Sequence, residues 1–136
     1  MAKILKAGEK FKLKRKVDGK DVEQEVDMLD LPYDFDSLLQ AGTMSGSSAI
    51  IVLDDSVDIV EALANISEFY AHESCGQCTP CRVGSEKAVK LMEQGPWDAG
   101  LLTELSTLMR DASICGLGQA ASSAVESAIG RLGVYR

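Results

Sequence analysis

Four cysteines, and the loops in which they fall, constrain the fold of this chain more than any other feature. Cys75, Cys78 and Cys81 form a C-x2-C-x2-C run, and Cys115 follows after 33 intervening residues. Helical patterning on both sides places the run between two predicted helices, and Cys115 between two others. The four thiols can act at one centre only if the chain folds so that these two loops meet.

Apolar residues recur at helical spacing over most of the chain after residue 56. Asp54, Asp55 and Ser56 are candidate caps for the first helix, while Thr79 is the candidate cap of the second and Pro80 suits its first position. The pattern predicts helices over about 57–71, 80–95, 98–110 and 118–132. Four helices of this length joined by short loops predict a small bundle.

The first 28 residues have a strand pattern instead. Asp18-Gly19 favours a type I′ turn, so that residues 9–28 pair as a β-hairpin. A one-residue slip would misplace every cross-strand pair, which specifies the register. On one face Lys10, Lys12, Lys14 and Lys16 stand opposite Asp27, Glu25, Glu23 and Asp21, and on the other face Phe11 pairs with Val26, Leu13 with Gln24 and Arg15 with Val22.

Two short elements are expected between the hairpin and the bundle. Residues 34–41 predict a helix that Asp34 caps and Gly42 ends. Ala49–Leu53 is a run of apolar residues and predicts a short buried strand. We therefore expect a mainly α fold, with a β-hairpin arm over residues 1–33 and a four-helix-bundle domain over residues 34–136.

Length and charge exclude several classes of protein. A chain of 136 residues suits one domain with a small appendage, and its net charge of −7 suits neither nucleic acid nor an anionic membrane. Residues 1–20 hold eight of the fourteen Lys and Arg, but the cross-strand acids account for most of them. No apolar stretch approaches the roughly 20 residues of a membrane-spanning helix. The N-terminus lacks the features of a secretory signal, so we expect a cytoplasmic protein.

The cysteine spacing favours a [4Fe–4S] cubane over two alternatives. Cysteines three residues apart can hold three iron corners, and a distant fourth completes the site when the bundle folds. The run differs from that of bacterial ferredoxins, because Ser85 stands where their fourth cysteine would be. Zinc sites usually join C-x2-C to a second close pair, which Cys115 lacks. Disulfides need an oxidising compartment, which nothing here indicates. Zinc and disulfides stay open on spacing alone.

Residues beside the cysteines suit a centre of negative charge. Glycines would let backbone N–H groups approach sulfur, while the start of the helix at Thr79-Pro80 and the cation of Arg82 would raise the reduction potential. Those glycines are Gly76, Gly84, Gly116 and Gly118.

Four neighbouring residues have more than one interpretation. Glu73 and Arg82 either surround the cluster or pair with each other. We expect His72 to lie exposed at a helix end rather than to act as a ligand. Trp97 is expected to anchor a turn rather than to carry electrons.

A longer pattern adds a family resemblance. Glu73-Ser-Cys-Gly-Gln-Cys-Thr-Pro-Cys-Arg-Val-Gly84 resembles the cluster signature of the NADH-binding flavoprotein subunit of complex I, and of related diaphorase subunits of NAD-linked hydrogenases and formate dehydrogenases. Ser113-Ile-Cys-Gly-Leu-Gly-Gln-Ala-Ala121 resembles the loop of the fourth ligand. Phe35-Asp-Ser-Leu38, Ala41-Gly-Thr-Met-Ser-Gly46, Val52-Leu-Asp-Asp55 and Phe69-Tyr-Ala-His-Glu73 resemble the segments before the signature. The resemblance implies a four-helix iron–sulfur domain with Cys75, Cys78, Cys81 and Cys115 as ligands of one [4Fe–4S] cluster.

The chain also departs from that family. It lacks the glycine-rich loop that binds the nucleotide, and its hairpin matches neither of the family's preceding domains, so we expect it to bind neither FMN nor NADH. Ser122-Ser123-Ala124 replaces the Asn-Pro often found after the fourth ligand, which bears on packing and not on ligation. We expect the cluster domain to exist here as a separate small polypeptide.

The resemblance implies a non-catalytic electron-transfer subunit of a multi-subunit oxidoreductase. Its single cluster would relay electrons between the redox centres of partner subunits, which are a flavoprotein, a catalytic subunit of the hydrogenase or formate dehydrogenase kind, or both. A freely diffusing one-cluster carrier would differ only in having no stable partner. The alternative is a structural zinc or iron–sulfur module that serves interaction or assembly without redox turnover.

Overall fold

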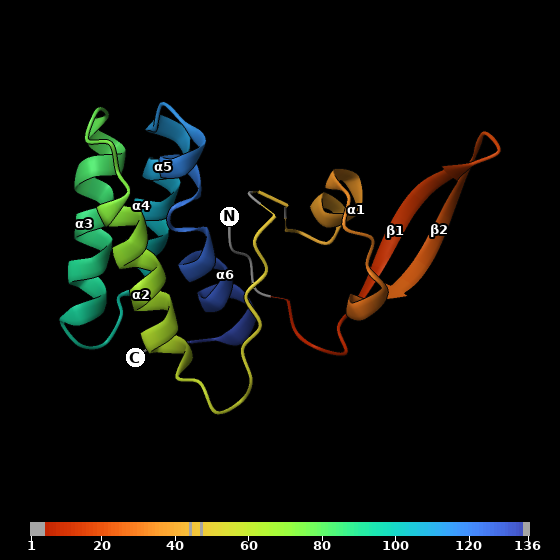
Figure 1. Ribbon diagram of the computed structural model, residues 1–136, viewed down its shortest axis with the longest axis horizontal. Coiled ribbons are helices and arrows are strands. Elements are labelled where there is room, and N and C mark those ends of the chain that lie inside the picture. The colour runs from red at the N-terminus through yellow and green to blue at the C-terminus, as the bar shows by residue number, and fades with distance from the viewer. Residues whose placement is uncertain (1–4, 44, 47, 135–136) are drawn as a thin grey trace. The chain divides into compact units, whose positions relative to one another are not determined.

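The computed structural model describes residues 5–43, 45–46 and 48–134. Its secondary structure is mainly helical with one N-terminal β-hairpin, which confirms the expected fold class (Figure 1). The chain divides into two compact units, Met1–Ile50 and Ile51–Arg136, each described here by itself. Within the described ranges, no helix is both long and apolar enough to cross a membrane.

The hairpin of the first unit has the predicted register. Strands β1 (Lys10–Val17) and β2 (Lys20–Asp27) are antiparallel, and every cross-strand pair matches the prediction. Asp18 and Gly19 have φ angles of 50° and 77°, the two positive values that a type I′ turn requires. One lysine of the charged face approaches a diagonal acid: Lys10 Nζ lies 3.3 Å from Glu25 Oε1.

A short helix packs on this hairpin. After the 3₁₀ helix η1 (Met28–Asp30), α1 (Phe35–Gln40) begins at Asp34, whose carboxylate accepts the Ser37 N–H at 2.8 Å. Arg15 donates to Ser37 Oγ at 3.0 Å, and the Gln40 amide bonds both backbone groups of Lys14. The small core of the unit comprises Phe11, Leu13 and Ala41, with Leu5, Val26, Met28 and Leu31 packed against it.

The boundary between the two units and the segment Ala49–Leu53 differ from the sequence-based expectations. Because α1 packs on β1, the compact units divide after Ile50, whereas the predicted domain boundary follows residue 33. The predicted strand at Ala49–Leu53 was wrong: the segment has no regular structure, and Ile50 and Val52 are 70% and 87% exposed. The sheet among the described residues contains only β1 and β2, so the apolar run has no strand to pair with.

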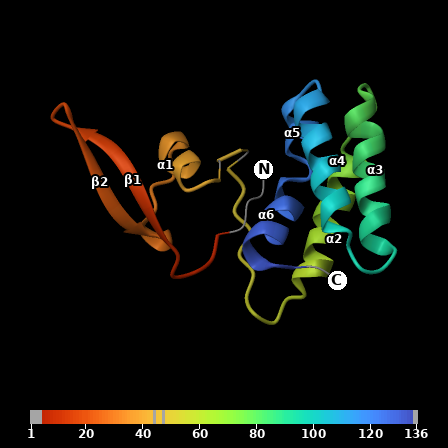
Figure 2. The same ribbon diagram turned by 180° about the vertical axis from the view of Figure 1, so that it is seen from behind.

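The second unit is a helical bundle, visible from both sides in Figures 1 and 2. Its first three helices confirm the predicted ones to within a few residues. The predicted helix over 118–132 is divided into two, with a break at Ala121 and Ser122. The helices are α2 (Ile59–His72), α3 (Thr79–Glu93), α4 (Ala99–Ala112), α5 (Gly116–Ala120) and α6 (Ser123–Leu132).

Two helix ends differ in detail from the prediction. Helix α2 is capped by Asp58, whose carboxylate accepts the N–H groups of Val60 and Glu61, rather than by residues 54–56. Helix α3 is capped by Cys78, which makes Thr79 its first residue and places Pro80 in the first turn. A cysteine at this position brings the start of α3 into the predicted cluster loop.

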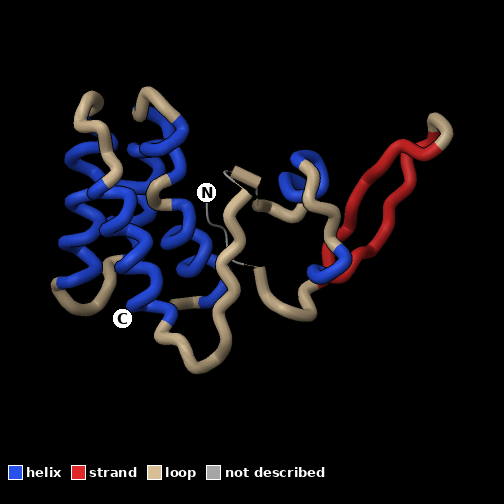
Figure 3. Tube along the Cα trace, in the orientation of Figure 1, coloured by secondary structure: helices blue, strands red, loops and turns tan. Residues whose placement is uncertain are grey.

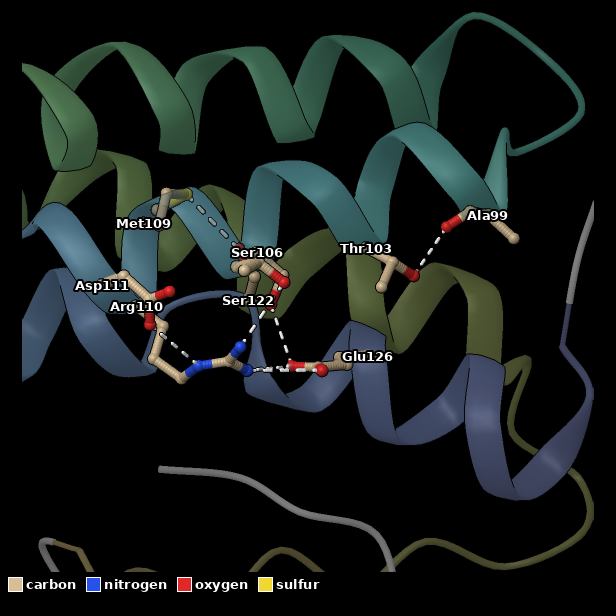
Figure 4. Close-up of polar contacts among 9 residues, drawn as sticks. Ala99, Thr103, Ser106, Met109, Arg110, Asp111, Ser122 and Glu126 are labelled. Atoms are coloured by element: carbon tan, nitrogen blue, oxygen red, sulfur yellow. Dashed lines mark hydrogen bonds and ion pairs between the residues drawn. The ribbon is translucent and has the colours of Figure 1, made fainter.

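Close packing of α4 against its neighbours organises the bundle. A β-carbon on Gly84 of α3 would lie 2.7 Å from the Cγ and Sδ of Met109, so glycine permits α3 and α4 to approach. Ser106 and Arg110 of α4 contact the carboxylate of Glu126 on α6, at 3.0 and 3.4 Å (Figure 4). The apolar core of the bundle includes Leu63, Met92, Leu102, Leu105, Met109, Val125 and Ala128.

Candidate metal centre

The two cysteine-bearing loops lie at the same end of the bundle. Figure 3 shows the α2–α3 and α4–α5 connections side by side there, and Figure 2 shows the same arrangement from behind. Cys78 occupies the N-cap position of α3 and Cys115 that of α5, neither with a side-chain capping bond, while Cys81 lies in the first turn of α3. Starting two helices at the cysteines directs both helix N-termini toward this end, where their partial positive charge favours thiolates.

Local hydrogen bonds shape the first loop. Gly76 has a φ of 76°, a left-handed conformation that glycine adopts without strain. The Arg82 guanidinium donates to the Gly76 carbonyl at 2.9 Å, which closes the loop onto α3. Ser74 Oγ lies 3.3 Å from Cys81 Sγ and accepts the Gly76 N–H at 3.4 Å. The loop is therefore held at both ends by its own residues.

The second loop is fixed in a similar way. The Ser113 N–H donates to the Met109 carbonyl at 3.1 Å and ends α4. The Gln119 side chain reaches back from α5 and donates from Nε2 to the Ser113 carbonyl at 3.1 Å. The Gln119 N–H donates to the Cys115 carbonyl at 3.2 Å. These bonds place Ile114 and Cys115 in a short, defined turn.

The two loops meet at Cys78 and Cys81. A β-carbon on Gly118 would lie 2.8 Å from the Cys81 Cβ and 2.5 Å from Ser113 Oγ, so only glycine fits between them. The backbone N–H of Ile114, followed by that of Cys81, holds the pKa of the Cys78 thiol below its ordinary value. A thiol of lowered pKa is more readily a thiolate, the form that binds metal. Ile114 of the second loop thus lowers the pKa of Cys78 in the first loop.

The four cysteines differ in exposure. Cys81 is 4% exposed, Cys78 is half-buried, and Cys75 and Cys115 are exposed. All four are free thiols. Among the described residues, no three His, Cys, Asp or Glu side chains form a group that could hold a metal ion. The structure brings Cys78 and Cys81 against the second loop, but it does not gather all four sulfurs around one point.

The neighbours of the cysteines take simple structural roles. Arg82 binds the Gly76 carbonyl, whereas Glu73 lies beside His72, with 3.2 Å between Oε1 and Nδ1. His72 is exposed at the end of α2, as expected. Trp97 is buried and donates from Nε1 to the Met92 carbonyl at 3.1 Å, which anchors the α3–α4 turn as expected.

The glycines serve backbone geometry and packing more than contact with sulfur. The N–H groups that lower the pKa of Cys78 most belong to Ile114 and Cys81, not to a glycine. Gly84 and Gly118 permit close packing, and Gly76 permits a turn. Sequence reasoning missed Ile114 and Ser113. Their only signal was their place immediately before Cys115.

The residues present fit a metal–sulfur group. The possible donors are four free thiols on two loops that touch. One of these thiols, that of Cys78, has a lowered pKa. Between the loops lies the Ser113 hydroxyl, which is buried and has no hydrogen-bond partner among the described residues. Buried polar groups in folded proteins almost always have partners. An unpaired hydroxyl at the contact between the two cysteine loops is consistent with a bound group that completes the site.

The bundle and its loops define a helical domain that carries four free cysteines on two loops at one end. Residues 61–132, slightly more than half of the chain, match the family described as the NADH-ubiquinone oxidoreductase-F iron-sulfur binding region. The chain belongs to this family, whose cofactor is a [4Fe–4S] cluster.

Individual relatives agree with this assignment. The chain is similar to an NADH-quinone oxidoreductase subunit of Rhizobium meliloti, with 40% identity over 74% of this chain and 25% of the relative. It is also similar to the corresponding NADH-quinone oxidoreductase subunit of Rickettsia conorii, with 41% identity over 77% of this chain and 25% of the relative. The mitochondrial NADH-ubiquinone oxidoreductase 51 kDa subunit of Neurospora crassa is 44% identical over 64% of this chain and 19% of the relative. The chain spans a quarter or less of the length of these relatives.

Proposed function

We propose that this chain is an electron-transfer module that holds one [4Fe–4S] cluster through Cys75, Cys78, Cys81 and Cys115. The observation that carries the proposal is the contact between the two loops, where Gly118 packs on Cys81. At the same contact the N–H of Ile114 lowers the pKa of the Cys78 thiol. This contact brings the neighbours of Cys115 to the C-x2-C-x2-C run. Four cysteine thiolates are the usual ligand set of a cubane.

The chain's own residues would set the environment of the cluster. A bound cluster supplies one-electron transfer. The N–H groups of Ile114 and Cys81 and the N-terminus of α3 favour negative charge on the sulfurs. Arg82 holds the first loop closed and adds a cation beside it. Ser74 contacts the Cys81 sulfur from the same loop. Each of these groups stabilises the more negative, reduced state.

We further propose that the module works within a multi-subunit oxidoreductase and relays electrons between centres on partner subunits. Its relatives are named as subunits of NADH-quinone and NADH-ubiquinone oxidoreductases, which supports an NADH-linked complex. A hydrogenase or formate dehydrogenase is a candidate catalytic subunit of that complex. Exposure of Cys75 and Cys115 supports electron exchange at this end of the bundle. The cytoplasm is the proposed compartment.

The test is to purify the full chain without oxygen and measure iron, acid-labile sulfide and zinc per chain, followed by a redox titration monitored by EPR. The proposal predicts about four iron and four sulfide, and a signal that appears reversibly with one electron. Stoichiometric zinc without sulfide, from iron-replete cells, would contradict it and leave a structural module. A cluster that cannot be reduced and reoxidised would contradict the relay but not the ligands.

A further inference from the structure

Ser113 is unusual among the buried serines of the described residues. It is 6% exposed, and its hydroxyl is buried with no hydrogen-bond partner in the part of the chain that the structure describes. The other buried serine hydroxyls have partners: Ser37 donates to the Asp34 carboxylate, Ser67 to the Leu63 carbonyl, Ser85 to the Cys81 carbonyl and Ser106 to Glu126. Leaving a buried hydroxyl unpaired costs free energy. The position of Ser113 therefore calls for an explanation.

The backbone of Ser113 holds the side chain in place. Its N–H donates to the Met109 carbonyl, and its carbonyl accepts from the Gln119 side chain, both at 3.1 Å. Gly118 packs on the side chain, because a β-carbon there would lie 2.5 Å from the Ser113 Oγ and 2.7 Å from its Cβ. The hydroxyl is thus fixed in the layer between the two cysteine loops.

A cysteine lies next to this hydroxyl. The Cys81 Cβ touches the same face of Gly118. No sulfur among the described residues, that of Cys78 included, lies in hydrogen-bonding geometry with the Ser113 hydroxyl. This buried hydroxyl therefore has no acceptor among the described residues. Sulfur that carries negative charge in a bound cluster is an acceptor of the right kind.

We propose that Ser113 is a positioning residue whose hydroxyl would donate a hydrogen bond to a sulfur of the bound cluster where the two cysteine loops meet, and would thereby raise the reduction potential. This inference rests on the proposed function, because it requires the cluster. Reduction adds one electron, supplied by the electron-donating partner, and the hydroxyl keeps its proton throughout. Because the reduced cluster is the more negative, the donor stabilises it more than the oxidised cluster.

The test compares three forms of the full chain, each purified without oxygen: wild type, Ser113→Ala and Ser106→Ala. Ser106 is the matched control, since it lies on α4, is similarly buried, and has a hydroxyl whose partner is Glu126 rather than sulfur (Figure 4). Iron and sulfide content, midpoint potential by EPR titration, and the melting temperature of the cluster-free chain are measured for each form.

The two variants are expected to change different quantities: the potential in Ser113→Ala and the melting temperature in Ser106→Ala. Ser113→Ala keeps the iron and sulfide of wild type, shifts the potential to a more negative value, and melts no lower than wild type without the cluster, because its hydroxyl has no partner there. Ser106→Ala lowers the melting temperature and leaves the potential unchanged, because it loses a bond to protein.

Three results would overturn the inference. They are an unchanged potential in cluster-loaded Ser113→Ala, a folded Ser113→Ala chain that takes up no iron, and a lower melting temperature of its cluster-free form, as in Ser106→Ala. If the wild-type chain itself contained no iron and sulfide, the proposed function would be overturned together with this inference. The three results above leave the proposed function intact, so the two failures are distinguishable.

Discussion

Gly118 packs directly on Cys81, since a β-carbon on Gly118 would lie 2.8 Å from the Cys81 Cβ. The two residues belong to α5 and α3, and each lies a few residues beyond the cysteine that caps its helix. The same β-carbon would lie 2.5 Å from Ser113 Oγ and 2.7 Å from Ser113 Cβ. The β-carbons of Ser113 and Cys81 are attached directly to the backbone, so neither can move away cheaply. The contact sets the spacing of the two loops.

Gly118→Ala is therefore expected to separate the loops. Overpacking of this kind costs about 1–3 kcal/mol of the free energy of unfolding, and the variant should also bind less iron per chain. The measurements are urea unfolding and iron content. Gly116→Ala is the matched control, because it lies in the same short helix and a β-carbon there would meet nothing within 4 Å. Equal stability and iron content in the two variants would contradict the packing role of Gly118.

Trp97→Phe should reduce stability without affecting the metal centre. The change removes the Nε1–H that donates to the Met92 carbonyl at 3.1 Å, at the far end of α3 from the cysteines. An unpaired buried acceptor costs about 1–3 kcal/mol. We expect a lower free energy of unfolding by urea titration and an unchanged iron content. A loss of iron equal to that in Gly118→Ala would show that the two ends of α3 are not independent.

Asp34 should make the hairpin unit sensitive to acid. The Ser37 backbone N–H, its hydroxyl and, less strongly, Arg15 hold the pKa of Asp34 below 3.8. A lowered pKa means that the charged cap stabilises the folded state fully above pH 3.8, and that this stability is lost as the pH falls through the folded-state pKa. NMR titration of the Asp34 carboxyl should give a lower midpoint in the folded chain than in urea. A folded-state midpoint at or above 3.8 would be the contrary result.

The apolar segment at residues 50–53 should be the first site of thermolysin cleavage. Ile50, Ile51 and Val52 are all exposed and have no regular structure, and thermolysin cleaves before such apolar residues. Brief digestion followed by mass spectrometry should locate the first cut there. Initial cleavage elsewhere, with this segment protected, would favour the buried strand that the sequence pattern indicated.

The parts of the fold that local patterns determine were predictable. The hairpin register followed from Asp18-Gly19 and from the charges on both strands, because each is a short-range signal. The strand at Ala49–Leu53 was wrong because an apolar run does not reveal whether a partner strand exists. The break between α5 and α6 was missed because the apolar spacing of Val125 and Ala128 continues the pattern before it.

The candidate site divides in the same way. Spacing and family resemblance singled out the four cysteines, and the structure places two of them against the second loop. Ser113 and Ile114 could not be found in advance, because their roles arise from contacts with residues more than 30 positions away. Gly118 was noted, but for backbone access to sulfur rather than for its packing on Cys81.

If the two loops hold one cluster between them, Cys115 is indispensable, because it is the only cysteine of the second loop. The measurement is iron and acid-labile sulfide per chain in anaerobically purified wild type and Cys115→Ser, with folding checked by circular dichroism. We expect about four of each in wild type and a clear loss in the folded variant. Full, stable iron and sulfide in Cys115→Ser would contradict it.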